Sequence, residues 1–194
     1  MTSLEQESRM VIDDLKIGVL IPTFNNANTL QSVIKGCLHF TNNIIVVNDG
    51  STDETGVILN QFPQIGVIHC ETNQGKGMAI KRGFAEAEKR HFDYVVTIDS
   101  DGQHYPDDIP YLINPLRRHR GSIIIGSRDM EREGIPGKSS FGNRFSNFWF
   151  KFHTGLDLPD TQSGYRIYPL KAISRLKLIT WRFEFEVEIL VKAA

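Results

Sequence analysis

The sequence is poor in cysteine, and this scarcity limits the chemistry that it can perform. Two cysteines, Cys37 and Cys70, occur among 194 residues, and both lie in apolar stretches. Two isolated thiols provide neither a disulfide framework nor the paired spacing of a cysteine metal site. We therefore expect two buried thiols in a reducing compartment.

A strong charge of one sign and long apolar runs are also lacking. The chain carries 22 basic and 23 acidic side chains, a net charge of -1, so no excess of positive charge indicates a nucleic-acid partner. Residues 1–15 are polar and acidic, unlike a secretory signal peptide. No apolar run approaches the roughly 20 residues of a membrane-spanning helix. These absences predict a soluble, cytosolic chain.

What the sequence does contain is a regular alternation of short apolar runs and helical patterns. Runs rich in β-branched residues predict strands at 16–21, 43–49, 65–70, 94–99 and 122–128. Between them, apolar residues recur with helical spacing, as in the segment that begins near Asn28 and the segment after residue 77. This alternation predicts an α/β fold, Rossmann-like, with a mostly parallel sheet and helices on both faces.

The length fits a single domain over residues 1–194, with residues 1–15 as a polar N-terminal arm. Beyond Asp129 the alternation fades into a loop, an aromatic helix over 141–153 and the segment 160–170. The aromatic side chains of that helix could pack in the core or lie on a membrane surface, and we expect the core; they are Phe145, Phe148, Trp149 and Phe152. The last residues are still apolar and periodic, so we expect the natural chain to continue beyond Ala194.

Polar or glycine-rich residues follow every predicted strand. In parallel sheets, ligands bind at the carboxyl ends of the strands. The five segments that follow the strands are PTFNN (22–26), NDGSTD (48–53), NQGKG (73–77), DSDGQH (99–104) and GSRD (126–129). The sequence therefore predicts one ligand site assembled from five loops.

The segment DSDGQH places Asp99 and Asp101 on either side of a single residue. Two carboxylates about 4 Å apart repel each other by roughly 4 kcal/mol at an effective dielectric constant near 20. Either one is protonated, or both face water, or a cation lies between them. With Gln103 and His104 nearby, they offer oxygen ligands for Mg²⁺ or Mn²⁺, which would hold a diphosphate. The alternative is a solvated acidic loop that caps the following helix at Asp107.

Other loops offer contacts for a nucleoside and for phosphate. Asp49 could accept hydrogen bonds from a base or a ribose, although a plain turn before a capped helix explains that segment equally well. Lys76 lies between two glycines at a predicted helix start, which favours phosphate or base contact. The P-loop and GxGxxG patterns are absent from the sequence, which excludes those two nucleotide sites. Arginines in the second half, with Arg128 best placed after a strand, suit bidentate phosphate binding.

Taken together, the loops resemble those of the family 2 glycosyltransferases, which have the GT-A nucleotide-diphospho-sugar transferase fold, and especially the dolichyl- or polyprenyl-phosphate mannosyl- and glucosyltransferases. The segments that carry the resemblance are VLIPTFNN, IIVVNDGSTDET, NQGKGMAIKRG, VVTIDSDGQHYPDDI, IIIGSR and DTQSGYRIY. They span most of the chain, and their order is far more specific than any one motif. One departure is the pair Asn25-Asn26, where the family usually has Asn-Glu, so a carboxylate is missing from the first loop.

The resemblance implies a single catalytic domain that transfers a hexose, with inversion, from GDP-mannose or a UDP-sugar. The acceptor would be a polyprenyl or dolichyl phosphate, and the protein would work in the cytoplasm at the inner face of the membrane. Nucleotide contacts would come from Pro22, Phe24, Asn26, Asp49, Lys76, Asp99 and Ser100. The Mg²⁺ or Mn²⁺ ion would be held by Asp99, Asp101 and Gln103. Acceptor contacts would come from Arg128, Lys138, Ser140, Arg144, Gln162, Ser163 and Arg166, with Asp160 beside them. Catalysis would depend on Asp99, Asp101 and Arg128.

A lipid phosphate is already an anion near neutral pH, so its attack needs no base, which agrees with the lack of an obvious His or Glu base beside the two aspartates. Two alternatives stay open: transfer to a glycan hydroxyl in cell-surface polysaccharide synthesis, and a non-catalytic nucleotide-sugar-binding module. A sugar-phosphate nucleotidyltransferase would have a glycine-rich loop after the first strand. A phosphoacceptor receiver domain would have an acidic pair there. PTFNN provides neither.

Overall fold

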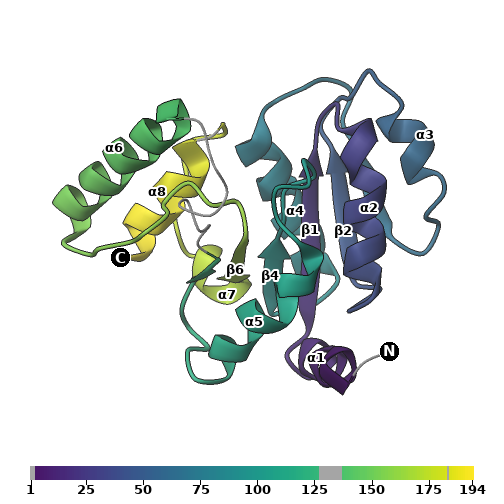
Figure 1. Cartoon of the computed structure of the whole chain (residues 1–194), viewed down its shortest axis with the longest axis horizontal. Helices are drawn as coiled ribbons and strands as arrows, with labels where there is room; N and C mark the ends of the chain where they lie inside the picture. The colour runs from purple at the N-terminus through teal and green to yellow at the C-terminus, as the bar shows by residue number, and fades with distance from the viewer. Residues whose placement is uncertain (1–2, 127–136, 183) are drawn as a thin grey trace.

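The structure is a computed structural model that describes residues 3–126, 137–182 and 184–194 (Figure 1); the side chains of Ser3 and of residues 137–145 lie outside this description. A six-stranded sheet has the order β3-β2-β1-β4-β6-β5. Its strands are β1 (Ile17–Thr23), β2 (Ile44–Asn48), β3 (Gly66–His69), β4 (Tyr94–Thr97), β5 (Ile124–Ile125) and β6 (Arg166–Pro169). The mostly parallel sheet and the α/β class predicted from the sequence are confirmed.

Helices cover both faces of the sheet because its strands are apolar on both sides. In β1, Val19 and Ile21 belong to one buried cluster and Leu20 to the other. The first cluster includes residues of α1 (Ser3–Asp14), α2 (Ala27–Leu38), α3 (Thr55–Leu59), α5 (Ile109–Ile113) and η2 (Asn114–Arg117), and η1 (Pro106–Asp108) precedes α5. The second includes residues of α4 (Lys76–Lys89), α7 (Leu170–Ile173) and α8 (Glu184–Ala193).

Strand β6 is one element that the sequence did not predict. It lies between β4 and β5 and runs antiparallel to both. Arg166 at its start pairs with Thr97 at the end of β4. The loop that precedes β6 therefore reaches the edge of the sheet where the parallel strands end.

The first residues form a helix that the sequence, which suggested a polar arm, did not predict. Ser8 and Ile12 of α1 are buried. The Arg9 side chain donates hydrogen bonds from Nε to the carbonyl of His39 at 2.9 Å and from Nη2 to that of Leu38 at 2.9 Å. Carbonyls at a helix C-terminus have no partner within the helix, so Arg9 satisfies the end of α2.

The expectation that the aromatic helix packs in the core is wrong for most of the side chains described. This helix is α6 (Gly137–Thr154), which lies against α8 and away from α2 and α3 (Figure 1). Phe148 is 63% exposed, Trp149 43% and Phe152 70%, whereas Phe150 is buried. Phe145 lies outside the described side chains. Among the described side chains of this helix, Phe150 packs in the interior and the other rings are left on the surface.

Both cysteines are reduced, as expected, but only Cys37 is fully buried. Burial raises the pKa of the Cys37 thiol to about 12. The Cys70 sulfur accepts a hydrogen bond from Arg82 Nη1 at 2.5 Å. Within the described ranges, no helix combines the length and the apolar character that crossing a bilayer requires.

Glu188 fixes the segment that leads into α8. Its carboxylate accepts hydrogen bonds from the backbone N–H groups of Ile179 and Thr180 and from the Thr180 hydroxyl, and Lys192 Nζ lies 2.6 Å from Oε1. Burial alone would raise the pKa of Glu188, but Lys192 and the hydrogen bonds from residues 179 and 180 lower it to about 2. The segment it holds contacts the start of α4, since the carbonyl of Trp181 accepts the Met78 N–H at 2.8 Å.

We expect Glu188→Gln to lower the free energy of unfolding by about 1 to 2 kcal/mol at neutral pH. Because the folded pKa lies below the unfolded one, the contribution of the carboxylate is complete above pH 4.5 and is lost as the pH falls toward 2. Urea unfolding of both proteins at several pH values measures this difference. Glu184→Gln, an exposed change in the same helix, is the control. A difference that persists undiminished at pH 2.5 would contradict the assignment.

Candidate active site

A cleft of about 400 Å³ lies where the parallel strands end. Its walls come from the loops after β1, β2, β3 and β4, where the strand-end rule predicted a site. Of the fifth predicted loop, GSRD (126–129), only Gly126 lies within the described residues, and it does not line the cleft. All the residues predicted to contact a nucleotide line the cleft: Pro22, Phe24, Asn26, Asp49, Lys76, Asp99 and Ser100. Asp101 also lines the cleft, together with Thr23, Asn73, Gly75 and Ala79. The structure thus brings the predicted nucleotide residues together, while their roles stay predictions.

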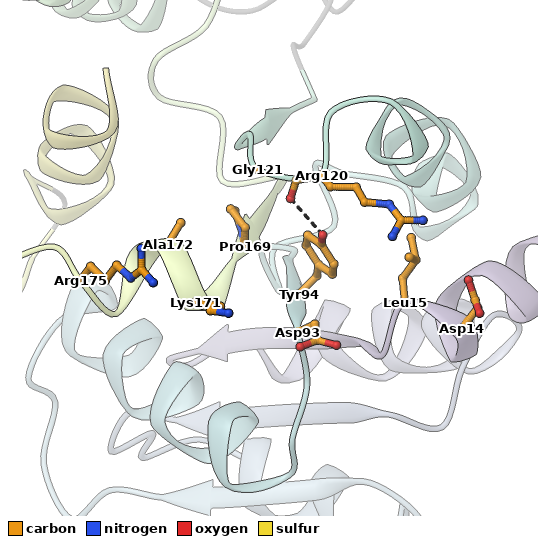
Figure 2. Close-up of a pocket in the computed structure, with 10 residues that line it drawn as sticks. All are labelled: Asp14, Leu15, Asp93, Tyr94, Arg120, Gly121, Pro169, Lys171, Ala172 and Arg175. Carbon is orange, nitrogen blue, oxygen red and sulfur yellow. Dashed lines mark hydrogen bonds between the residues drawn. The ribbon is translucent and has the colours of Figure 1, made fainter.

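A larger hollow, of about 540 Å³, lies at the other end of the strands, near the start of β4 (Figure 2). Tyr94, at the start of β4, donates a hydrogen bond across it to the carbonyl of Arg120 at 2.9 Å. Lys171 of α7 and Arg175, which follows that helix, line another side. Strand β4 reaches this hollow with its amino end, whereas ligands of parallel sheets bind at the carboxyl ends of the strands. We therefore treat the smaller cleft as the candidate site.

Asp49 organises one wall of the cleft. Its buried carboxylate accepts the N–H of Gly75 at 2.8 Å and that of Gln74 at 3.1 Å. These backbone N–H groups precede α4, so Asp49 ties the loop after β2 to the loop that leads into that helix. Asp49 therefore positions Lys76, the first residue of α4.

The two asparagines of the first loop also connect loops. Asn26 Nδ2 donates to the Ser100 hydroxyl at 2.8 Å, which joins the first loop to the loop after β4. Asn25 Oδ1 accepts the Thr52 N–H at 2.8 Å. Asn25 has a φ of 53°, a left-handed conformation that asparagine tolerates better than most residues. An amide thus holds the loops together where the family usually has a carboxylate.

Lys76 is bound by two carboxylates. Its Nζ lies 2.7 Å from Asp99 Oδ1 and 2.9 Å from Glu186 Oε2. Burial alone would lower the pKa of Lys76, but Glu186 and then Asp99 raise it above its usual value. The ammonium therefore stays charged at any physiological pH and neutralises part of the acidic lining of the cleft.

Asp99 and Asp101 differ in their surroundings. Asp99 is half-buried, and the backbone of Gly164 packs so closely against its carboxylate that a β-carbon there would overlap it. Asp101 is exposed, and its Oδ1 accepts the N–H of Gln103 at 2.9 Å. The Gln103 side chain is exposed as well and does not line the cleft.

The donor set fits a divalent cation that is shared with a ligand. Among the described residues, no group of three or more His, Cys, Asp and Glu side chains could hold a metal. A closed protein site is therefore absent from this part of the chain. Mg²⁺ keeps several water ligands and binds through one or two carboxylates plus substrate phosphates. Asp99 and Asp101, on one wall of an open cleft, match that requirement.

Glu186 and Gly164 belong to the site although the sequence analysis did not identify them. Glu186 is 5% exposed, and in the part of the chain that the structure describes its Oε1 is buried without a hydrogen-bond partner. The signal that could have found it is its position on the buried face of α8, beside Phe185, Ile189 and Leu190. A carboxylate on a core-facing position is uncommon unless it is paired.

The residues predicted to contact the acceptor are only partly described. Arg128 lies outside the described residues, and Lys138, Ser140 and Arg144 lie in α6 without a described side chain. Gln162 is exposed, and its N–H donates to Asp160 Oδ1 at 3.0 Å.

Ser163 and Arg166 are buried and bonded internally. The Ser163 hydroxyl donates to the carbonyl of Gly126 at 2.5 Å. The Arg166 guanidinium donates to the carbonyls of Ser163 at 2.6 Å, Glu186 at 2.7 Å and Thr161 at 2.8 Å, and to the Tyr168 hydroxyl. Both side chains therefore hold the loop before β6, and neither exposes a surface to an acceptor.

Comparison with known proteins identifies the family. The model of the family described as "Glycosyl transferase family 2" matches residues 18–177. A UDP-N-acetylglucosamine–dolichyl-phosphate N-acetylglucosaminyltransferase of Methanococcus voltae is 30% identical, over 93% of this chain and 80% of its own length. An undecaprenyl-phosphate mannosyltransferase of Micrococcus luteus is 28% identical, over 93% of this chain and 78% of its own.

Among solved structures, glucosyl-3-phosphoglycerate synthase of Mycobacterium tuberculosis, in complex with Mn²⁺, UDP and glucosyl-3-phosphoglycerate, has a TM-score of 0.71 at 22% identity. The similarity covers 96% of this chain and 67% of that one and supports the GT-A fold. The family match covers most of the chain and agrees with the resemblance of the loops. The chain belongs to glycosyl transferase family 2.

Proposed function

We propose that this chain is a single catalytic domain that transfers a hexose, with inversion, from a nucleotide-diphosphate sugar to a polyprenyl phosphate at a membrane surface. The observation that carries the proposal is the meeting of Asp99, Asp101 and Lys76 in one open cleft at the carboxyl ends of the strands. The names of relatives that use dolichyl or undecaprenyl phosphate support the acceptor class. The fold neighbour that binds UDP with Mn²⁺ supports the donor class.

The donor would occupy the cleft with its nucleoside beside the loops after β1 and β2. Phe24 is 42% exposed and offers a ring face for a base. The Asp49 carboxylate fixes the loop that leads into α4, which forms another wall of the cleft. The diphosphate would then lie toward Asp99 and Asp101, at the end of β4.

Asp99 and Asp101 would hold the divalent cation, Mg²⁺ or Mn²⁺. A bound cation neutralises the negative charge that develops on a departing nucleotide, which lowers the barrier to its departure. The Lys76 ammonium, bound by Asp99 and Glu186, would add a further positive charge near the leaving group. Gln103 would need to reach the cation from an exposed position, and we propose it as an outer contact.

The acceptor would approach from the loop before β6. A phosphate attacks as an anion, so the chain needs positive charge to orient it more than a base to deprotonate it. Arg166 and Ser163 would shape this loop from inside. We propose that Gln162 is the residue of this loop that meets the acceptor phosphate, while the contact predicted for Arg128 lies outside the described residues.

The exposed rings of α6 support a lipid acceptor. We name the surface formed by Phe148, Trp149, Phe152 and Leu156 the aromatic face; every one of these side chains is at least 43% exposed. The residues of α6 include no acid and several bases, which suits an anionic membrane surface. Asn147 of the same helix donates to the carbonyl of Pro159 at 2.8 Å and accepts the Thr161 N–H at 3.0 Å. The aromatic face is thus anchored beside the proposed acceptor loop.

Removal of either aspartate tests the catalytic proposal. We expect Asp99→Asn and Asp101→Asn to reduce transfer by about 100-fold or more, because the charge on the leaving nucleotide loses its counter-charge. Asp107→Asn, an exposed change a few residues away, should leave transfer unchanged. Calorimetry with GDP and UDP, in Mn²⁺ and in a chelator, and an assay with radiolabelled nucleotide sugars measure the two effects. Equal nucleotide affinity in Mn²⁺ and in chelator would refute the cation.

The membrane surface is tested by replacing Phe148, Trp149 and Phe152 together with Ser. We expect binding to phosphatidylglycerol vesicles to fall about tenfold or more, because the apolar area that enters the interface is lost. The control replaces three apolar side chains elsewhere on the surface, each at least 63% exposed: Met10, Val57 and Tyr111. Co-sedimentation with vesicles measures binding. Transfer to a short-chain, water-soluble polyprenyl phosphate should persist in both variants. Undiminished vesicle binding by the Ser variant would contradict the assignment of this face.

A further inference from the structure

Glu186 binds Lys76 of the cleft lining but does not itself line the cleft. It comes from α8, 85 residues beyond Asp101, and its backbone carbonyl accepts a hydrogen bond from Arg166 Nη1 at 2.7 Å. Its side chain is only 7% exposed. One oxygen binds Lys76, and within the described residues the other is buried without a partner.

A divalent cation at Asp99 would meet Lys76 as a competitor. Asp99 Oδ1 is 2.7 Å from the ammonium, so a cation that takes this oxygen must displace a positive charge already bound there. The ammonium is itself only 18% exposed and cannot simply move into water. A positive charge left in a half-buried cleft beside a second one is repelled, unless another anion accepts it.

Glu186 provides that second anion. It is already in contact with Lys76 Nζ, and its Oε1 has acceptor capacity that nothing in the described chain uses. The ammonium can therefore transfer its full interaction from Asp99 to Glu186 with a small movement of a flexible side chain. No bond is made or broken, and the total charge of the cleft side chains does not change.

We propose that Glu186 is a positioning residue that takes over Lys76 when Asp99 binds the divalent cation. The inference rests on the proposed function, because it requires a cation at Asp99. In the absence of the cation, Lys76 holds Asp99 in place between Gly164 and the cleft. In its presence, Glu186 retains Lys76 close to the donor diphosphate.

The test is a double-mutant cycle on Mn²⁺ affinity, measured with Mn²⁺ alone by the electron paramagnetic resonance signal of the free ion. We expect Glu186→Gln to weaken Mn²⁺ binding about tenfold or more, and Lys76→Met to strengthen it. In the Lys76→Met background, Glu186→Gln should weaken binding about threefold or less, because only the loss of a nearby negative charge remains. Glu184→Gln, an exposed loss of charge in the same helix, should have no effect.

The sign of the coupling separates the possible roles of Glu186. A larger loss in the presence of Lys76 than in its absence supports the transfer of the ammonium. An equal loss in both backgrounds overturns it and leaves Glu186 as a distant charge. A larger loss in the absence of Lys76 also overturns it, because Glu186 would then ligate the cation itself. Glu186→Asp keeps the charge and should restore much of the affinity. Glu186→Ala takes the place of Glu186→Gln in the cycle if circular dichroism finds the Gln variant unfolded.

The proposed function can fail separately from this inference. Weak divalent-cation sites in proteins have dissociation constants up to about 1 mM. The cation site itself is contradicted if the wild-type protein binds no Mn²⁺ at about 10 mM, roughly tenfold above that limit, either alone or with GDP or UDP. A wild-type protein that binds Mn²⁺, with no coupling between residues 76 and 186, contradicts only the role of Glu186.

Discussion

The candidate site depends on the two ion pairs that the Lys76 ammonium forms. The ammonium lies at the start of α4 and joins Asp99, at the end of β4, to Glu186 of α8, so that three elements distant in sequence meet at one charge. Carboxylates that face each other in a half-buried cleft require a counter-charge. Asp49 fixes the loop that presents the lysine, and Glu188 fixes the segment that leads to α8. The acidic cleft is stable without a ligand because these contacts hold one positive charge at its centre.

Much of the fold could be predicted from the sequence, because the sheet is apolar on both faces. The runs around Val19, Val46 and Val95 are too apolar to form solvated loops, so they must be buried strands. Ile80 and Phe84, at helical spacing, mark the buried side of α4. Strand β6 could not be predicted in this way. Its four residues begin with Arg166 and end with Pro169, and they become a strand only because β4 and β5 are available as partners. Such pairing depends on contacts between distant segments, which local patterns do not contain.

The candidate site was predictable to a similar degree. The residues that the strand-end rule and the resemblance of the loops predicted at the nucleotide line one cleft, since each lies at the end of a strand or in the segment that follows it. The partners of those residues could not be identified, because a hydrogen bond such as that of Asn26 with Ser100 spans 74 positions. The aromatic rings of α6 illustrate the same limit. Their pattern indicates an amphipathic helix, but only the tertiary structure reveals that α8 contacts one side and leaves Phe148 and Phe152 exposed.

The antiparallel direction of β6 has a consequence for how enzymes of this architecture can diversify. A parallel strand in this position would need a crossover of a dozen or more residues to return to the same edge. An antiparallel strand delivers its preceding loop, residues 160–165, directly beside the end of β4, as the pairing of Arg166 with Thr97 requires. Apart from Gly164, which packs against the Asp99 carboxylate, this loop can change in length or composition without altering the register of the four parallel strands. The surface beside the end of β4 can therefore vary while the parallel part of the sheet keeps its arrangement.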